Sequence, residues 1–289
     1  MSYANFIPTV WAEDFIRECE RAHVFVADCT RKYEGQLKKM GDEVVIPSLI
    51  DPEIHTISIK QKNDNIGEPE FLSDTSIRVK ADTIGYFNFA VSDIDEMQAK
   101  GDMFSEAKTR AAHKMANEHD QYVARMAASQ DAPVLFNAPK KVVEGTAGED
   151  EINVLRLIDL CAQRLYENDV PDKTTIVATI PPRLRTLIKS EYLDKDTDNS
   201  EMMQNGFVGK YGNVILRVSN NVYSTGNGSS LVDKIMVRTQ QAIAFVETLS
   251  DVMPYQPEKK VAVDALKGLS LYGGKIIRPR ELVVADVTY

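Results

Sequence analysis

The stretch Ser76-Ile-Arg-Val-Lys-Ala-Asp-Thr-Ile-Gly-Tyr-Phe-Asn-Phe-Ala-Val-Ser92 decides how the rest of the chain is interpreted, because apolar and polar side chains alternate along most of it. One face of this run carries Ile77, Val79, Ala81, Phe87, Phe89 and Val91. A period of two is typical of a β-strand with one covered face. Upstream, residues 44–46 and 56–60 are also of β type, and turn-like residues lie at 63–69. We therefore predict a long β-hairpin over residues 42–91.

A long hairpin needs support from other parts of a structure. A two-stranded ribbon is marginally stable in water, and its edges offer unpaired backbone groups to other strands. The apolar face of this hairpin is larger than one subunit is expected to cover. The sequence therefore predicts that neighbouring copies of the chain cover it.

The spacing of apolar residues changes after Ser92. They then follow at intervals of mostly three and four, through Ile94, Met97, Phe104, Ala107, Ala111, Met115, Tyr122 and Met126. This spacing predicts an amphipathic helix, and Ser92 with Asp95 resembles a capping box that begins it. A helix that runs to about residue 129 is roughly 57 Å long at 1.5 Å per residue. Helices in compact domains are usually shorter, so we interpret it as a strut.

The two ends of the chain show mixed structure. Helical spacing at the N-terminus predicts a helix over residues 10–27 that ends near His23. Residues 131–150 contain two prolines and two glycines and predict a junction. Beyond it we predict helices over 151–167 and 183–189, strands over 174–180, 214–219 and 234–238, and a C-terminal hairpin that turns near Pro279 and ends in strand 282–287. The fold class is therefore α+β.

The composition argues against several classes of protein. The chain has 289 residues and a formal net charge of −9. A protein that grips nucleic acid needs a basic excess, so we expect only weak contact with DNA. Three separated cysteines are no disulfide framework and fit a reducing cytosol. The sequence shows neither a leader peptide nor an apolar run long enough for a membrane span, so we expect folding in the cytoplasm and no membrane partner.

No set of residues predicts catalysis. The glycine-rich run 206–212 precedes a predicted strand, whereas a phosphate loop opens a helix. His113 and His119 are six residues apart and lie on different helix faces, so we predict no metal site between them. Neither Cys29 nor Cys161 lies in a hydrolase signature. Glu118 and Asp120 are interpreted as a solvated helix face, and we predict no catalytic residue, cofactor or metal.

Taken in order, the segments resemble the major capsid proteins of tailed double-stranded-DNA bacteriophages, which have the Hong Kong 97-type fold. Three parts of the chain carry the resemblance. They are Asn5-Phe-Ile-Pro-Thr-Val-Trp-Ala12 through Tyr33-Glu-Gly-Gln36 with Gly41-Asp-Glu-Val-Val-Ile-Pro47; Ala265-Leu-Lys-Gly-Leu-Ser-Leu-Tyr-Gly-Gly-Lys-Ile-Ile-Arg-Pro-Arg-Glu-Leu282; and, more weakly, Gly212 through Asn221. These motifs are structural rather than catalytic, and their order is stronger evidence than any one of them.

The resemblance implies a division of the chain into five parts. Residues 1–35 correspond to the N-terminal arm, 36–90 to the extended loop that lies over an adjacent subunit, and 91–149 to a peripheral domain with its spine helix. Residues 150–254 correspond to the axial domain at the capsomer centre. Residues 255–289 correspond to a return to the sheet of the peripheral domain.

The resemblance also implies the partners. Such proteins assemble into hexamers and pentamers of an icosahedral head that encloses double-stranded DNA, with a portal protein at one vertex. The arm-like sequence begins within a few residues of Met1, so we expect a separate scaffolding protein; a decoration protein stays open. We expect assembly in the host cytoplasm and a final place in the virion capsid.

Seven apolar residues are expected at subunit interfaces, because they lie in the arm and on the hairpin: Trp11, Phe15, Ile57, Ile59, Phe71, Ile77 and Val79. Obligate interfaces of this kind are large and rich in apolar contact. Two alternatives remain at this point. One is an encapsulin-type nanocompartment shell with the same fold, and the other is a soluble α/β enzyme built on the second region.

Overall fold

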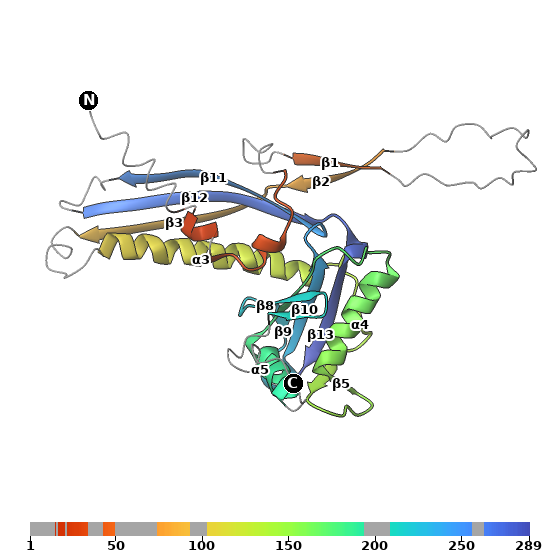
Figure 1. Ribbon diagram of the computed structural model, residues 1–289. Helices are drawn as coiled ribbons and strands as arrows, with labels where there is room; N and C mark the ends of the chain where they lie inside the picture. The colour runs from red at the N-terminus through yellow and green to blue at the C-terminus, as the bar shows by residue number, and fades with distance from the viewer. Residues whose placement is uncertain are drawn as a thin grey trace, which may run out of the picture.

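The computed structural model describes residues 15, 17–20, 22–33, 43–49, 74–92, 103–193, 209–255 and 263–289. Within these residues the strands form a two-stranded, a three-stranded and an eight-stranded sheet. Figure 1 shows two bodies: an elongated one above and a lobe below one of its ends. We call the three-stranded sheet with helix α3 the rod, and the eight-stranded sheet with helices α4 and α5 the lobe.

The rod is a long antiparallel sheet with one helix beneath it. Its strands are β3 (Thr83–Ser92), β11 (Ile243–Tyr255) and β12 (Val263–Ile276), in the order β11–β12–β3. Helix α3 (Met103–Arg125) lies along one face, where Phe87, Phe89 and Leu266 pack near Met115. Along β3, side chains alternate between half-buried and exposed from residue 83 to residue 90, which confirms the predicted period of two.

A hairpin covers part of the other face of the rod. Strands β1 (Glu43–Leu49) and β2 (Asp74–Lys80) pair antiparallel from Glu43 opposite Lys80 to Leu49 opposite Asp74. Their buried side chains pack on β11 and β12; the cluster contains Val44, Ile46, Val79, Ala244, Val246 and Leu271. The predicted hairpin is thus confirmed for these two strands. The prediction is wrong for residues 83–91. The strand is interrupted at Ala81 and Asp82, and β3, which follows, pairs with β12 instead of with the hairpin.

The lobe is a mixed sheet with two helices on one face. Its strand order is β5–β4–β13–β10–β6–β8–β7, with β9 paired to β10. The bounds are β4 (Lys140–Val143), β5 (Glu151–Asn153), β6 (Ile176–Ile180), β7 (Lys210–Tyr211), β8 (Val214–Val218), β9 (Ser224–Thr225), β10 (Val232–Thr239) and β13 (Leu282–Thr288). Helices α4 (Val154–Glu167) and α5 (Pro182–Leu193) bury their apolar faces against β6, β10 and β13. Asn153 begins α4, because its side-chain oxygen accepts hydrogen bonds from the backbone N–H groups of Leu155 and Arg156.

Short 3-10 helices join the elements: η2 (Val26–Asp28), η5 (Met126–Ala128), η6 (Gly228–Ser230) and η7 (Pro279–Glu281). The last helical residue of the N-terminal helix is Ala22, so the helix ends near His23, as predicted. Helix α3 is described over 23 residues, about 35 Å at 1.5 Å per residue, and the predicted capping box at 92–95 is not wholly within the described residues. No helix among the described residues is long and apolar enough to span a membrane.

The predicted C-terminal hairpin is wrong. Strand β12 belongs to the rod, whereas β13, beyond Pro279, pairs with β10 and β4 in the lobe. In the same way β10 lies in the lobe and β11 in the rod, although only residues 240–242 separate them. The three predicted segments 91–149, 150–254 and 255–289 therefore each contribute to both bodies. The first contains α3 of the rod and β4 of the lobe, the second contains most lobe strands and β11 of the rod, and the third contains β12 of the rod and β13 of the lobe. Side-chain periodicity identifies a strand but carries no information about which distant strand pairs with it.

Candidate assembly surfaces

Residues 24–28, which we call the N-terminal segment, are held in place where the rod meets the lobe. The buried carboxylate of Asp120 on α3 accepts hydrogen bonds from three consecutive backbone N–H groups, those of Val24 (2.8 Å), Phe25 (3.0 Å) and Val26 (3.0 Å). Burial raises the pKa of Asp120 above its usual value, and the three N–H groups act in the opposite direction. The sequence interpretation of Glu118 and Asp120 is right for Glu118, which is exposed, and wrong for Asp120.

A buried arginine holds the same segment from the lobe side. Arg238 on β10 donates from Nη2 to the backbone oxygen of Phe25 (2.7 Å) and from Nη1 to that of Asp28 (2.8 Å). The carboxylate of Asp28 pairs with Arg217 on β8, with a shortest N–O distance of 3.2 Å. The segment thus contacts α3, β8 and β10 at once, and an apolar cluster that includes Phe25 and Val26 fills the junction.

The face of the rod away from α3 is only partly covered. The hairpin covers it near Leu271, but three large apolar side chains farther along stay exposed: Ile84 by 42%, Leu269 by 43% and Tyr86 by 75%. Tyr86 lies directly opposite Leu269 in the pairing of β3 with β12, so both side chains are on the same face. We call Ile84, Tyr86 and Leu269 the rod patch. An apolar group of this kind on a single chain is typical of a surface that a partner covers.

The edge of the rod offers a second surface. Strand β3 is an edge strand of its sheet, and a groove of about 820 Å³ lies between it and α3. Phe87 and Ala111 contribute apolar lining, and Arg110 and Lys114 contribute positive charge. Edge strands present backbone N–H and C=O groups with which a strand of another chain can pair.

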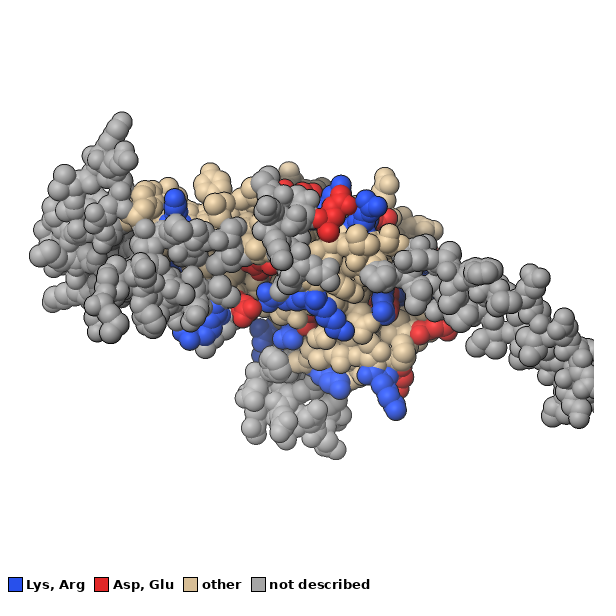
Figure 2. Space-filling model, turned by 90° about the horizontal axis from the view of Figure 1, so that it is seen from above, with Lys and Arg blue, Asp and Glu red and all other residues tan. Residues whose placement is uncertain are grey.

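Charged groups are mixed on the face seen from above. Figure 2 shows lysine and arginine side chains close to aspartate and glutamate, with broad areas of other residues between them. At the base of the hairpin, for example, Glu43 pairs with Lys80 at 2.7 Å and with Arg78 at 3.3 Å. Over the described residues of this face the positive charge does not gather into one large patch of the kind that binds nucleic acid strongly.

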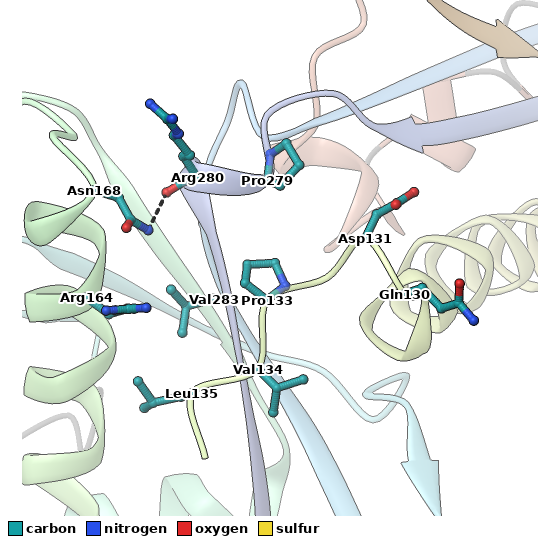
Figure 3. A pocket seen from close by; sticks show the side chains of 10 residues that line it. All are labelled: Gln130, Asp131, Pro133, Val134, Leu135, Arg164, Asn168, Pro279, Arg280 and Val283. Atoms are coloured by element: carbon teal, nitrogen blue, oxygen red, sulfur yellow. Dashed lines mark hydrogen bonds between the residues drawn. The ribbon is translucent and has the colours of Figure 1, made fainter. Parts of the chain in front are cut away.

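One pocket lies at the junction between the bodies (Figure 3). It measures about 340 Å³ and is lined from α4, from residues 130–135 and from the chain around Pro279. Asn168 donates a hydrogen bond to the backbone oxygen of Arg280 (3.0 Å) beside it. The described lining includes Asp131, Arg164 and Arg280 but no histidine, cysteine, serine or lysine. It does not hold the paired nucleophile and base that a hydrolase needs.

The seven predicted interface residues divide into three groups. Phe15 is fully buried within the subunit and stacks on Phe87 with ring centroids 4.8 Å apart, and Val79, on strand β2 of the hairpin, is buried against the rod. Ile77 is half-buried on β2. The other four lie outside the described residues: Trp11, Ile57, Ile59 and Phe71. Since the chain itself covers Phe15 and Val79, these two side chains offer no surface to a neighbour in this conformation.

Sequence reasoning missed the rod patch and the hydrogen bonds that hold residues 24–28 between α3 and β10. A signal for the patch was present, because Ile84 and Tyr86 occupy positions on β3 that the alternation assigns to the polar face. The role of Asp120 had no local signal, since its partners lie 94 to 96 positions away in the chain.

Comparison with known proteins agrees with this architecture. No protein-family model and no curated protein sequence matches the chain. Among solved structures, a chain of Mycobacterium phage Che8 is similar with a TM-score of 0.67 at 24% identity, over 91% of this chain and 90% of that one. The capsid structure of cyanophage P-SCSP1u gives 0.62 at 15% identity, over 87% and 85%.

A virus-like particle from Pyrococcus furiosus is also similar, with a TM-score of 0.53 at 10% identity, over 96% of this chain and 99% of that one. At such identities the likeness concerns the fold. In these three comparisons it covers 85% or more of each chain, so it concerns the arrangement of the chain as a whole rather than one part of it. The chain has the Hong Kong 97-type capsid fold.

Proposed function

We propose that this chain is the major capsid protein of a tailed double-stranded-DNA bacteriophage and that its function is self-assembly. The observation that carries the proposal is the rod patch on a chain with a capsid fold. Ile84, Tyr86 and Leu269 stay exposed on the same face on which the hairpin buries Leu271. Burying apolar surface stabilises by about 25 cal/mol per Å², so repeated contacts over a closed shell add up to a large stabilisation.

In this proposal the rod corresponds to the peripheral domain and the lobe to the axial domain that points to the centre of hexamers and pentamers. The hairpin and residues 1–35 correspond to the extended loop and the arm, both of which contact neighbours. Residues Trp11, Ile57, Ile59, Phe71 and Ile77 stay predicted interface positions. A separate scaffolding protein, a portal and weakly bound DNA are the proposed partners, with assembly in the host cytoplasm and a final place in the virion.

We also propose that the chain is not an enzyme. The described residues of the two pockets contain no set of nucleophile, base and orienting group. This favours a shell-building role over the soluble α/β enzyme.

The proposal is tested by expressing the chain alone and with scaffolding protein, followed by negative-stain microscopy and light scattering. We expect shells or capsomers for the wild type. Tyr86→Asp should abolish them because it places a charge in an apolar contact, while Tyr86→Phe should assemble normally. Val134→Asp is a matched control, since Val134 is also exposed, by 49%, but lies outside the rod.

A stable monomer for the wild type under all these conditions would contradict the proposal, and so would normal shells for Tyr86→Asp. The likeness to the Pyrococcus furiosus particle keeps a protein-filled nanocompartment as the second candidate. The contents of native particles separate the two, because a phage head contains double-stranded DNA and a nanocompartment contains protein cargo.

A further inference from the structure

Three side chains of the types that bind metal ions lie close together between the N-terminal helix and α3. Cys19 in the N-terminal helix and His23 at the end of that helix, four residues apart, face His119 of α3. The distance from Cys19 Sγ to His23 Nε2 is 3.8 Å, and that from His23 Nε2 to His119 Nδ1 is 3.3 Å. All three residues are buried, and their ligand atoms lie within 4.8 Å of one another. We call them the Cys-His cluster.

We propose that the Cys-His cluster is a structural zinc site that fastens the N-terminal helix to α3. In a tetrahedral site with Zn–S near 2.3 Å and Zn–N near 2.0–2.1 Å, neighbouring ligand atoms lie about 3.3–3.6 Å apart. The observed separations of 3.3 Å and 3.8 Å are close to these values. Thiolate sulfur and imidazole nitrogen are the donors that zinc takes in structural sites.

The surroundings of His119 favour this assignment. Ser270 on β12 donates its hydroxyl proton to Glu247 Oε1 (3.2 Å), and its oxygen lies 3.2 Å from His119 Nε2. The ring therefore carries its proton on Nε2, which donates to Ser270, and the lone pair of Nδ1 points into the cluster. Metal-bound histidines typically have their second ring nitrogen held by a hydrogen bond in this way.

A carboxylate lies beside His119 and places negative charge next to the cluster. Glu247 Oε1 lies 3.6 Å from His119 Nδ1, and Glu247 Oε2 lies 3.9 Å from Arg31. The Cys19 thiolate and the Glu247 carboxylate would together carry two negative charges opposite the double charge of zinc, with Arg31 on the outer side of the carboxylate. Burial lowers the pKa of His23 to about 4 and that of His119 to about 3, which keeps both imidazoles neutral and able to bind a metal.

Burial also raises the pKa of the Cys19 thiol to about 12. Zinc must therefore displace this proton when the Zn–S bond forms, and the proton leaves to solvent. The site joins the N-terminal helix to α3, which are far apart in the chain, and Ser270 links it by a hydrogen bond to β12. This assignment concerns folding of the single chain and does not depend on the proposed capsid function.

The test uses the full chain without a histidine tag, dialysed against zinc and then against metal-free buffer. We expect about one zinc ion per chain in the wild type, because the three side chains form a single cluster. Cys19→Ser should lose most of it, and Cys161→Ser should keep it, since Cys161 is equally buried but packs in the lobe core. A strong chelator should lower the Tm of the wild type and of Cys161→Ser but not that of Cys19→Ser.

Cobalt substitution tests the wild type directly, even where Cys19→Ser fails to fold. Tetrahedral Co²⁺ with a thiolate ligand gives intense visible bands and a sulfur-to-cobalt charge-transfer band in the near ultraviolet, and added zinc should remove both. The proposal is overturned if the wild type retains no zinc and Co²⁺ produces no such spectrum. The buried groups would then form only a chain of hydrogen bonds from His23 to Glu247.

Discussion

The lobe and the rod use their sheets in different ways. In the lobe, α4 and α5 cover one face of the sheet, and the junction with α3 and the N-terminal segment covers the other. Strand β13 is accordingly buried at each residue from Leu282 to Ala285. In the rod, α3 covers one face, but the hairpin covers only part of the other, so Tyr86 stays three-quarters exposed. The lobe completes its own core, whereas the rod presents a face that other copies of the chain can complete.

This contrast separates stability from assembly. Substitutions in the lobe core should change the free energy of unfolding of the single chain. Substitutions in the rod patch should leave that free energy nearly unchanged and act on association instead. The predictions that follow test this division, from the largest expected effect to the smallest.

Asp120→Ala should be the most destabilising substitution, at about 4 kcal/mol. It leaves the buried N–H groups of Val24, Phe25 and Val26 without their acceptor, and each unpaired buried donor costs about 1–3 kcal/mol. Urea unfolding followed by circular dichroism measures the loss. Glu118→Ala, an exposed position on the same helix, is the control and should change stability by less than about 0.5 kcal/mol. Equal effects of the two substitutions would show that Asp120 does not hold the junction.

Leu165→Ala in the lobe should cost about 3 kcal/mol. The side chain is fully buried between α4 and the sheet, and such truncations lose both transfer free energy and packing. Ile84→Ala in the rod is the matched comparison, because Ile84 is 42% exposed and should cost well under about 1 kcal/mol. Shell yield should respond in the opposite order once the amount of folded protein is equalised. If Ile84→Ala destabilised the single chain as much as Leu165→Ala, the rod face would not be an open surface.

Gly273→Ala should cost about 2 kcal/mol and loosen the hairpin from the rod. A Cβ atom at this position would lie 2.0 Å from the Lys80 carbonyl oxygen and 2.9 Å from the Cα of Ala81, so backbone must move. Hydrogen exchange should rise in β2 more than in the lobe. Gly148→Ala provides the control, because its Cβ would meet only the Glu151 side chain at 3.5 Å. Unchanged exchange in β2 would contradict the tight contact.

Glu43→Gln should have the smallest effect, and one that depends on pH. Lys80 and then Arg78 lower the pKa of Glu43 below the ordinary value of 4.5 for a glutamate. A lowered pKa in the folded state means that the contribution is present above pH 4.5 and is lost as the pH falls through the lowered value. The difference between wild type and Glu43→Gln in protection of the hairpin should therefore be measurable at pH 7 and vanish in strong acid. Since the pair is exposed, high salt should reduce it as well.

Local patterns predicted the individual elements better than their partners. The period of two in β3 and the helical spacing of α3 are both confirmed, because each reflects one covered face of a single element. The apolar run from Leu282 correctly predicted a strand, but its assignment to a hairpin with the residues from Lys267 to the turn near Pro279 was wrong. Burial on both faces replaces alternation with a continuous apolar run, which is typical of an inner strand but does not indicate which strands lie beside it.

The candidate site was predicted in outline only. Apolar residues of the hairpin were expected to cover a neighbour, yet Val79 is used to attach the hairpin to the rod of its own subunit. Likewise His119 was weighed against His113 on its own helix, whereas its close partners are His23 and Ser270. Contacts between segments about a hundred positions apart depend on the packing of the whole chain, which spacing within one helix cannot reveal.

The chain passes between the rod and the lobe several times, and two of these passages are short: residues 240–242 and residues 277–281. Two such connections restrict rotation of the lobe relative to the rod more than a single connection does, because a rotation about one of them would strain the other. The hydrogen bonds from the N-terminal segment to Asp120 of α3 and to Arg238 of β10 also link the rod to the lobe at this place. These connections and bonds restrict movement of the lobe against the rod, so a subunit placed in differently curved parts of a shell is expected to adapt mainly at its periphery.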